Sequence, residues 1–197
     1  PDSILWCVRD DGVFVGLTYQ RSENVIAWHQ HKLGGTFGTG ASATGYGVVE
    51  SVASISGELT EDELYVIVKR TIGGATKRYV EVFAPFDFDE TLSTDFKFLD
   101  SHLIYSGSST TTLSGLSHLE GQTVSILADG STHADKQVSS GSVSLDRSVT
   151  SAVVGLSYDS ILQTMRVEGG AAQGTSQGKT KRISKVVLRL FETVGAK

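Results

Sequence analysis

Cysteine is almost absent from this 197-residue chain, which contains only Cys7. A single cysteine cannot form an internal disulfide bond, so disulfide bonds within the chain are excluded as a source of stability. Cys7 lies in an apolar run with the alternation of a β-strand, where we expect a buried and inert thiol. A reactive thiol is the less favoured alternative because it would need an electropositive partner.

Long apolar runs and helical periodicity are also scarce. No apolar run approaches the roughly 20 residues of a membrane helix, and no secretory signal pattern is present. We therefore expect a soluble chain without a membrane segment. Only Thr60 to Leu64 could hold a helical turn. Abundant Gly, Ser and Thr, with Val and Ile in short runs, predict an all-β fold instead.

Basic residues are fewer than acidic ones. The chain has 17 Lys and Arg against 22 Asp and Glu, a formal net charge of −5. This balance argues against tight, generic binding to phosphate backbones. Basic residues do gather locally, in Lys69-Arg70, in Lys77-Arg78 and from Lys179 to Arg182. We interpret these groups as solvated strand faces or loops rather than as a nucleic-acid patch.

Alternating apolar residues predict six antiparallel strands in the first part of the chain. The sequences Asp11-Gly12 and Ser22 to Asn24 separate the first three and are typical of turns. Short turns between successive strands indicate meandering sheets, like the blades of a propeller. The predicted strands cover about residues 4–9, 13–20, 25–33, 47–56, 63–72 and 77–84.

Residues 34–47 are too rich in glycine for a regular element, so we predict an extended loop there. One interpretation is a tolerated insertion. The alternative is a candidate contact loop in which Phe37 and Tyr46 serve as anchors.

A second β-segment follows a connector that begins after Pro85. We interpret residues 95–168 as a small β-barrel or sandwich domain inserted into a main antiparallel β domain formed by residues 1–94 and 179–197, with a linker at 169–178. A final strand at 181–191 is expected to return to the first sheet. The strands predicted in the inserted domain cover residues 96–104, 122–128, 136–139, 142–145 and 152–156.

Three motifs imitate enzyme sites. Asp87 to Leu92 fits the DxDxT pattern of haloacid-dehalogenase-type phosphatases, but that chemistry needs a parallel sheet and Mg²⁺. Gly174 to Gly178 fits GxSxG without the helix of a nucleophile elbow. Gly38 to Ala43 imitates a dinucleotide loop, although a strand is expected where that fingerprint needs a helix. We therefore predict no catalytic residues and no cofactor, with Asp87 and Asp89 in a polar connector.

Histidines and aromatic residues suggest further sites. His29 and His31 would face the same side of a strand, a spacing that suits two metal ligands, but no third ligand is evident and no metal site is predicted. His118 is expected to stabilise a turn by a hydrogen bond rather than act as a base. Trp6, Tyr19 and Trp28 could form a sugar-stacking platform, but their spacing favours packing in a sheet core.

Several segments together resemble the nozzle-type tail proteins of short-tailed phages and prophages. The resemblance covers most of the chain, except residues 34–47. The segments are Trp6 to Gly12, Gly16 to Gln20, Val25 to His29, Val68 to Gly74, Phe98 to Asp100, Gly115 to Val124, Leu127 to Gly130, Val154 to Tyr158, Arg182-Ile183 and Val186 to Leu190.

The resemblance implies a non-enzymatic structural part of a tail tube or nozzle, made in the bacterial host cytoplasm and located in the virion tail. Its expected partners are other copies of itself and adjacent tail proteins in a ring through which DNA passes, with no small-molecule substrate. The alternative is a receptor- or carbohydrate-binding module of a tail fibre. Because the chain starts at Pro1 without a methionine, we expect it to be a fragment of a longer polypeptide.

Overall fold

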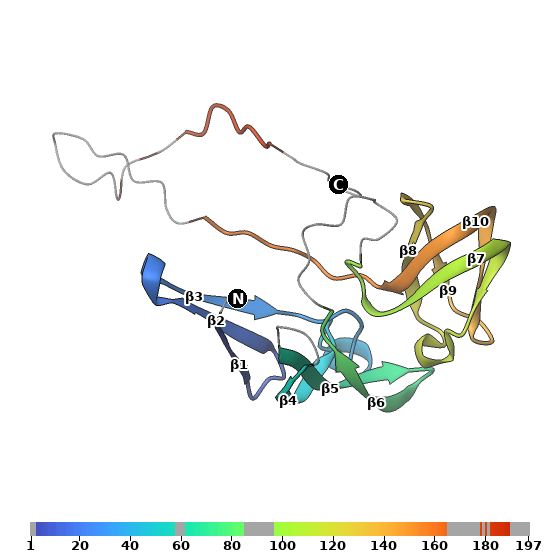
Figure 1. Cartoon of the computed structure of the whole chain (residues 1–197), viewed down its shortest axis with the longest axis horizontal. Helices are drawn as coiled ribbons and strands as arrows, with labels where there is room; N and C mark the ends of the chain where they lie inside the picture. Colours follow the sequence, from blue (N-terminus) through green and yellow to red (C-terminus); the bar gives the residue numbers. More distant parts are fainter. Residues whose placement is uncertain are drawn as a thin grey trace. The chain divides into compact units, whose positions relative to one another are not determined.

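The structure is a computed structural model of the whole chain and describes residues 3–57, 62–84, 97–164, 178, 180 and 182–189. In this part of the chain the regular elements are β-strands and short 3-10 turns, so the all-β prediction is confirmed. The strands form three antiparallel sheets, two with three strands and one with four (Figure 1).

The first sheet is a meander of β1 (Ile4–Val8), β2 (Phe14–Gln20) and β3 (Val25–His31). The turn predicted at Asp11-Gly12 is present: Gly12 has φ +78° and donates its N–H to the Arg9 carbonyl at 2.8 Å. The second turn is the 3-10 turn η1 (Arg21–Glu23), which ends at Asn24 with φ +57°. Asparagine tolerates this left-handed conformation better than most residues, which explains where the turn ends.

The second sheet is a meander of β4 (Val48–Ser56), β5 (Asp62–Ile72) and β6 (Ala75–Val82). Gly73 and Gly74 join β5 to β6, and their φ angles of +56° and +76° suit the tight hairpin turn of this twisted ribbon. The helical turn suggested for Thr60 to Leu64 is wrong over residues 62–64, which begin β5. Alternating apolar residues in β5 favour a strand more strongly than the short polar start favours a helix.

One face of each three-stranded sheet contributes to a shared apolar core. Trp6 of β1 stacks on Phe14 of β2 with ring centroids 4.7 Å apart and planes 6° from parallel. Phe14, Val66 and Val68 are fully buried, and burial of each such side chain contributes about 1.5–3 kcal/mol. The core residues are Phe14, Leu33, Val49, Leu64, Val66 and Val68, with Trp6, Val8, Val52 and Phe83 packed against them.

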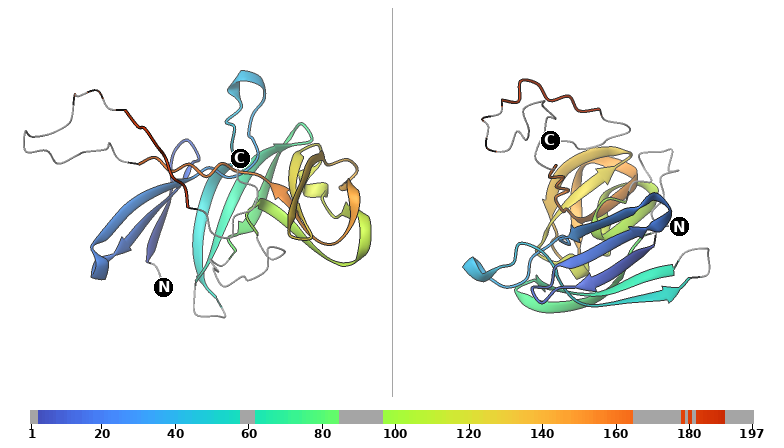
Figure 2. Two further views of the ribbon diagram at one scale, coloured as in Figure 1. Left: turned by 90° about the horizontal axis from the view of Figure 1, so that it is seen from above. Right: turned by 90° about the vertical axis from the view of Figure 1, so that its left-hand side faces the viewer.

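The third sheet consists of β7 (Asp100–Ser114), β8 (Thr123–Ala128), β9 (Ser131–Gln137) and β10 (Ser142–Leu156) in the order β7-β10-β8-β9. Figure 2 draws its strands in colours from yellow-green at β7 to orange at β10. Within the described residues β7 and β9 do not pair, so the sheet is open and the alternative of a closed barrel is not found. Its own core is built from Leu113, Leu116, Leu119, Val124, Ile126, Ala128, Val138, Val143, Leu145, Val149, Ala152, Val154 and Leu156.

The chain divides into two compact units, residues 1–158 and 159–197. The strand predicted at 181–191 is wrong over residues 182–189, which have no strand structure; positions 181, 190 and 191 lie outside the described residues. The division into a main domain and an inserted domain stays a prediction. No helix in the described part of the chain is both long and apolar enough to cross a membrane.

Candidate functional site

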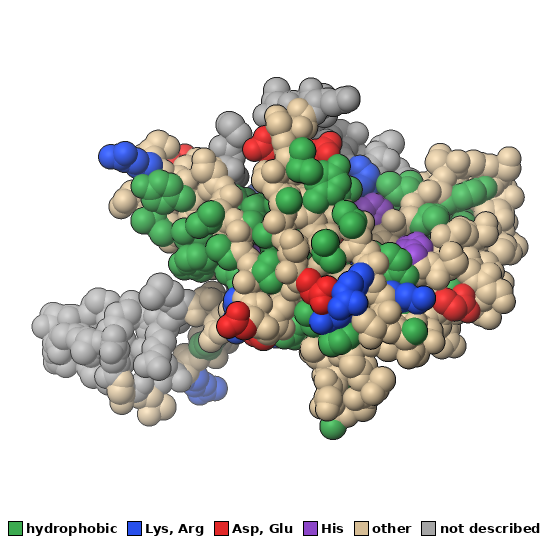
Figure 3. Space-filling model, turned by 90° about the horizontal axis from the view of Figure 1, so that it is seen from below, with side chains coloured by type: hydrophobic (Ala, Val, Ile, Leu, Met, Phe, Trp, Pro, Cys, Tyr) green, Lys and Arg blue, Asp and Glu red, His purple; other side chains and the backbone are tan. Residues whose placement is uncertain are grey.

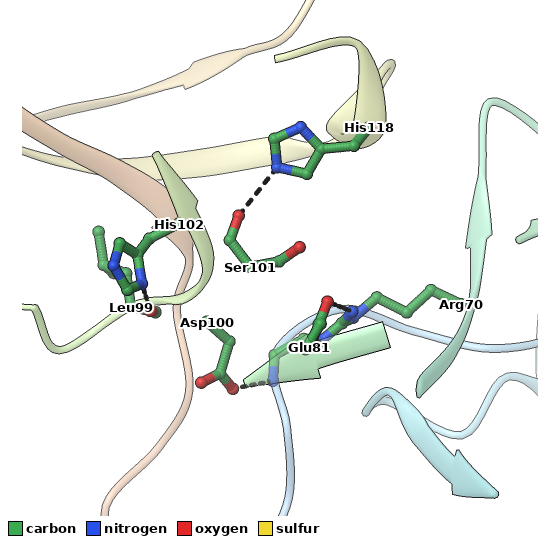
Figure 4. A network of polar contacts seen from close by, with 8 residues as sticks. Arg70, Glu81, Leu99, Asp100, Ser101, His102 and His118 are labelled. Carbon is green, nitrogen blue, oxygen red and sulfur yellow. Dashed lines mark hydrogen bonds and ion pairs between the residues drawn. The ribbon is translucent and has the colours of Figure 1, made fainter. Parts of the chain in front are cut away.

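A partly buried ion pair lies where the second and third sheets approach each other. Arg70 of β5 is fully buried because it occupies the same strand face as Val66 and Val68. Its guanidinium binds both carboxylate oxygens of Glu81 on β6, with the second contact, Nη2 to Oε2, at 3.1 Å (Figure 4). This bidentate geometry is the strong form of a charge-assisted hydrogen bond.

The glycine-rich loop connects this ion pair to the third sheet. Arg70 Nε donates to the Gly34 carbonyl at 2.7 Å, and the Gly34 N–H donates to Asp100 Oδ2 at 2.7 Å. A Cβ atom at Gly35 would lie 2.9 Å from the Arg70 side chain, and one at Gly47 would lie equally close. Part of the loop's glycine content is therefore explained by the space that the arginine requires.

Asp100 begins β7 beside this pair. Burial raises the pKa of its carboxyl group, and the nearby Glu81 acts in the same direction, whereas the Gly34 N–H and Arg70 oppose the shift. The next residue, Ser101, has a left-handed φ of +49°. His118 donates from Nε2 to the Ser101 carbonyl at 3.0 Å, so its predicted role as a hydrogen-bond residue is confirmed (Figure 4).

These contacts form a joint, which we call the Arg70 joint: Arg70, Glu81, Gly34 and Asp100. It connects the second sheet, the glycine-rich loop and the third sheet through three contacts: Arg70 with Glu81, Arg70 with Gly34, and Gly34 with Asp100. Removal of one partner would leave a buried polar group unsatisfied, which costs about 1–3 kcal/mol or more for a charge. The arrangement therefore holds the sheets in a defined geometry.

The predicted contact loop lies against the second sheet. Phe37 is partly buried beneath Lys69, whose Nζ is 4.3 Å from the ring centroid. The Tyr46 ring is 5.6 Å from Lys32 Nζ, and its hydroxyl donates to the Asp11 carbonyl at 3.3 Å. These contacts make both aromatic rings part of the loop's attachment to the protein.

The dinucleotide-like sequence Gly38 to Ala43 lies at the far end of this loop. It contains only the short 3-10 turn η2 (Gly40–Ser42), and the next regular element is β4. The absence of a long helix within the described residues that follow the loop agrees with the rejection of this motif, because a pyrophosphate site needs a helix N-terminus.

His29 and His31 lie on one face of β3, as predicted. His29 Nδ1 is 2.7 Å from His31 Nε2, and His29 Nε2 is 3.1 Å from Thr18 Oγ1. Burial lowers the pKa of His31, and the neighbouring His29 lowers it further. No cluster of three or more potential metal ligands occurs among the described residues. Both rings contact Trp6, with ring centroids 5.6 Å away for His29 and 5.2 Å away for His31.

Lys69 of β5 and Arg78 of β6 share one acidic partner. Glu50, at a bulge in β4, contacts Lys69 Nζ at 2.9 Å and Arg78 Nε at 2.7 Å. Hydrogen bonds from Arg78 and then Lys69 lower the pKa of Glu50 to about 2. The sequence interpretation of a solvated strand face agrees with Arg78, whose side chain is 57% exposed, but is wrong for Arg70, which is fully buried.

The outer face of the first sheet is apolar and exposed. Leu5, Leu17 and Trp28 lie opposite one another across the three strands. Trp28 is 62% exposed and Ile26 is 65% exposed. The prediction that the aromatic residues pack in a core is confirmed for Trp6 but wrong for Tyr19 and Trp28, because strand alternation places these two on the opposite face from Trp6.

The second sheet also has an apolar outer face. Ile67 of β5 lies opposite Val80 of β6, which is 71% exposed. Figure 3 shows hydrophobic side chains gathered on this side of the molecule beside a group of acidic and basic side chains. The exposed apolar residues of this sheet are Ile55, Ile67, Val80 and Val82.

The remaining predicted sites give mixed outcomes. Cys7 is free, but it is only partly buried, so the prediction of a buried thiol is wrong. Asp87 and Asp89 lie outside the described residues, as do positions 174–177 of the GxSxG motif. Arg182 is described, whereas Lys179 and Lys181 are not. No family model and no curated protein matches this chain.

Proposed function

We propose that this protein is a non-enzymatic structural component of a phage or prophage tail, where copies of it and adjacent tail proteins form a ring around the DNA exit path. Its location is the virion tail. The proposal follows from the sequence resemblance to nozzle-type tail proteins and from the physical character of the sheets.

The observation that supports this function best is the apolar outer face of both three-stranded sheets. Trp28 and Ile26 on one sheet and Val80 and Val82 on the other are all more than half exposed, although the opposite face of each sheet already forms a core. Apolar patches of this kind on a soluble protein are typical of protein–protein contact sites. A ring built from repeated copies would cover them.

The charge of the chain is compatible with passage of DNA. A net charge of −5 disfavours strong attraction to phosphates, and the cations Lys69 and Arg78 share an ion pair with Glu50. A conduit that bound DNA tightly would slow its passage.

Electron microscopy can test the proposal. The chain is expressed together with the proteins encoded by adjacent genes, and the purified particles are imaged. We expect closed rings with an axial channel that contain this protein. Single particles without rings, under conditions in which the adjacent proteins assemble with one another, would contradict it.

A carbohydrate- or receptor-binding module of a tail fibre is the second candidate. Exposed Trp28 and Tyr19 on one face of the first sheet favour it, because aromatic faces provide stacking surfaces. A glycan array separates the two functions. Specific glycan binding that is lost in Trp28→Ala and retained in Phe37→Ala would favour the fibre module, and no glycan binding would favour the structural part.

A further inference from the structure

The free edge of β3 lacks the usual protection of an edge strand. Within the described residues β3 has one neighbour, β2, and the pairing runs through all seven positions without a bulge. The strand contains no proline and no Lys, Arg, Asp or Glu. Exposed edges with these properties tend to pair with another strand.

The other edges of the two three-stranded sheets are less suitable. β6 contains Lys77, Arg78 and Glu81, and charged side chains discourage pairing. β4 is interrupted by a bulge at Glu50, and β1 has only five residues. Of these four edges, β3 is therefore the one on which an added strand fits best.

Residues 182–189 have the composition of a strand without a partner. In the described structure they have no strand pairing, although Ile183, Val186, Val187 and Leu188 are 71–78% exposed. A strand places Val186 and Leu188 on one face and Val187 on the other. The N-terminal half of β3 is likewise apolar on both faces, with Val25 and Ala27 on one side and Ile26 and Trp28 on the other.

Charge complementarity favours contact between this segment of one copy and the larger unit of a second copy. Residues 1–158 contain 10 basic and 19 acidic residues, whereas residues 159–197 contain seven basic and three acidic ones. Segment 182–189 itself has three basic residues and no acidic residue. The edge of β3 has no Lys or Arg and belongs to the acidic unit. It is thus a better receptor for segment 182–189 than the edge of β6, which carries Lys77 and Arg78.

We propose that residues 182–189 of one copy add as a fourth strand to the free edge of β3 in a second copy. Such a contact is heterologous, joining different surfaces of the two copies, and heterologous contacts generate rings when the rotation closes. Backbone hydrogen bonds would provide affinity and the apolar side chains would provide fit. The inference rests on the proposed function and specifies the contact between copies.

Disulfide trapping between two single-cysteine proteins tests this contact. In a Cys7→Ser background, the receptor carries Ile26→Cys and the donor carries Val186→Cys or Val187→Cys. The matched control receptor carries Val80→Cys, a similarly exposed position on the edge strand β6. On mixing under mild oxidation, we expect a mixed disulfide to form at least tenfold faster with Ile26→Cys, and faster with one donor position than with the other.

Proline variants of the donor test whether a strand is required. Val187→Pro in the Val186→Cys donor removes a backbone donor and should reduce trapping about tenfold. Ile161→Pro, at another exposed position outside the sheets, should not change it. Neither residue contributes to a sheet or a core, so both variants should fold.

Two results would overturn the proposal. One is equal trapping rates for the Ile26→Cys and Val80→Cys receptors. The other is a disulfide within the double variant Ile26→Cys/Val187→Cys that forms at a rate independent of protein concentration, which would place the segment on its own chain. Rings seen by electron microscopy without trapping at Ile26 would reject the strand addition and leave the proposed function intact.

Discussion

At the scale of single residues, Arg70 determines much of the local architecture. It is a charged residue on a buried strand face, bound to Glu81 and to the Gly34 carbonyl. The sequence interpretation treated Lys69-Arg70 as a solvated pair. The alternation from Leu64 to Val68 already indicates that position 70 faces inward, so this signal was present in the sequence. The partner Gly34 could not be predicted because it is 36 residues away.

Asp100 provides a prediction for the Arg70 joint. Its pKa is raised by burial, so the folded state binds a proton more readily than the unfolded state does. Stability should therefore fall as pH rises above about 3.9 and through the folded pKa. Asp100→Asn keeps an oxygen that can accept the Gly34 N–H and removes the titration. We measure the free energy of unfolding in urea as a function of pH. Over this range the variant should lack the decrease that wild type shows.

The matched variant Asp100→Ala separates charge from hydrogen bonding. It leaves the buried Gly34 N–H without its acceptor and should be less stable than Asp100→Asn by about 1–3 kcal/mol at every pH. Equal stability of the Ala and Asn variants would show that the hydrogen bond to Gly34 contributes nothing.

His31 gives the opposite pH dependence. Its pKa is lowered by burial and by His29, so protonation favours the unfolded state. Stability should decrease as pH falls below about 6.5 toward the folded pKa. His31→Gln should reduce this loss, which thermal unfolding between pH 7.5 and 5 can measure. A pH profile identical to that of wild type would contradict the explanation.

At the scale of elements, apolar alternation and turn residues explain which strands could be predicted. The strand predicted at 63–72 is observed at 62–72, and that predicted at 4–9 is observed at 4–8. β7 extends to Ser114, well beyond the predicted end at 104, because its serine- and threonine-rich half has no apolar alternation. β9 begins at Ser131, directly after the Asp129-Gly130 turn, although its exposed polar residues do not resemble a strand.

The glycine loop provides a prediction at this scale. Gly35 has φ +96°, and a Cβ atom there would lie 2.9 Å from the Arg70 side chain. Gly40 also has positive φ, +58°, but no atom lies within 4 Å of its Cβ position. Gly35→Ala should destabilise the protein by about 1–3 kcal/mol and more than the control Gly40→Ala. Chemical denaturation measures both, and equal losses would show that Arg70 does not constrain the loop.

At the scale of the whole molecule, the chain combines an acidic larger unit with a basic C-terminal one. The sequence predicted an all-β fold and weak attraction to DNA from composition and charge. It could not predict that both three-stranded sheets have apolar outer faces. Alternation of apolar and polar residues reveals which side of a strand faces the core only when the opposite side is polar. That signal is lost where both faces are apolar.

Weak DNA binding is the prediction at this scale. Fluorescence anisotropy with duplex DNA should give no submicromolar affinity at about 0.15 M salt, where the Debye length is near 8 Å. Residual binding at low salt should come from Lys179, Lys181 and Arg182. Its association constant should fall as the salt concentration rises, with a log–log slope of about −0.9 for each phosphate contact. Submicromolar binding that persists at this salt concentration would require a dedicated nucleic-acid surface.

The location of the protein tests the central claim most directly. Particles released from a bacterial strain that carries the gene in a prophage are purified and labelled with gold-conjugated antibody against this chain. The account predicts gold at the tail, together with peptides of this chain in mass spectra of the particles. Particles with complete tails that contain no copy of the protein would contradict it.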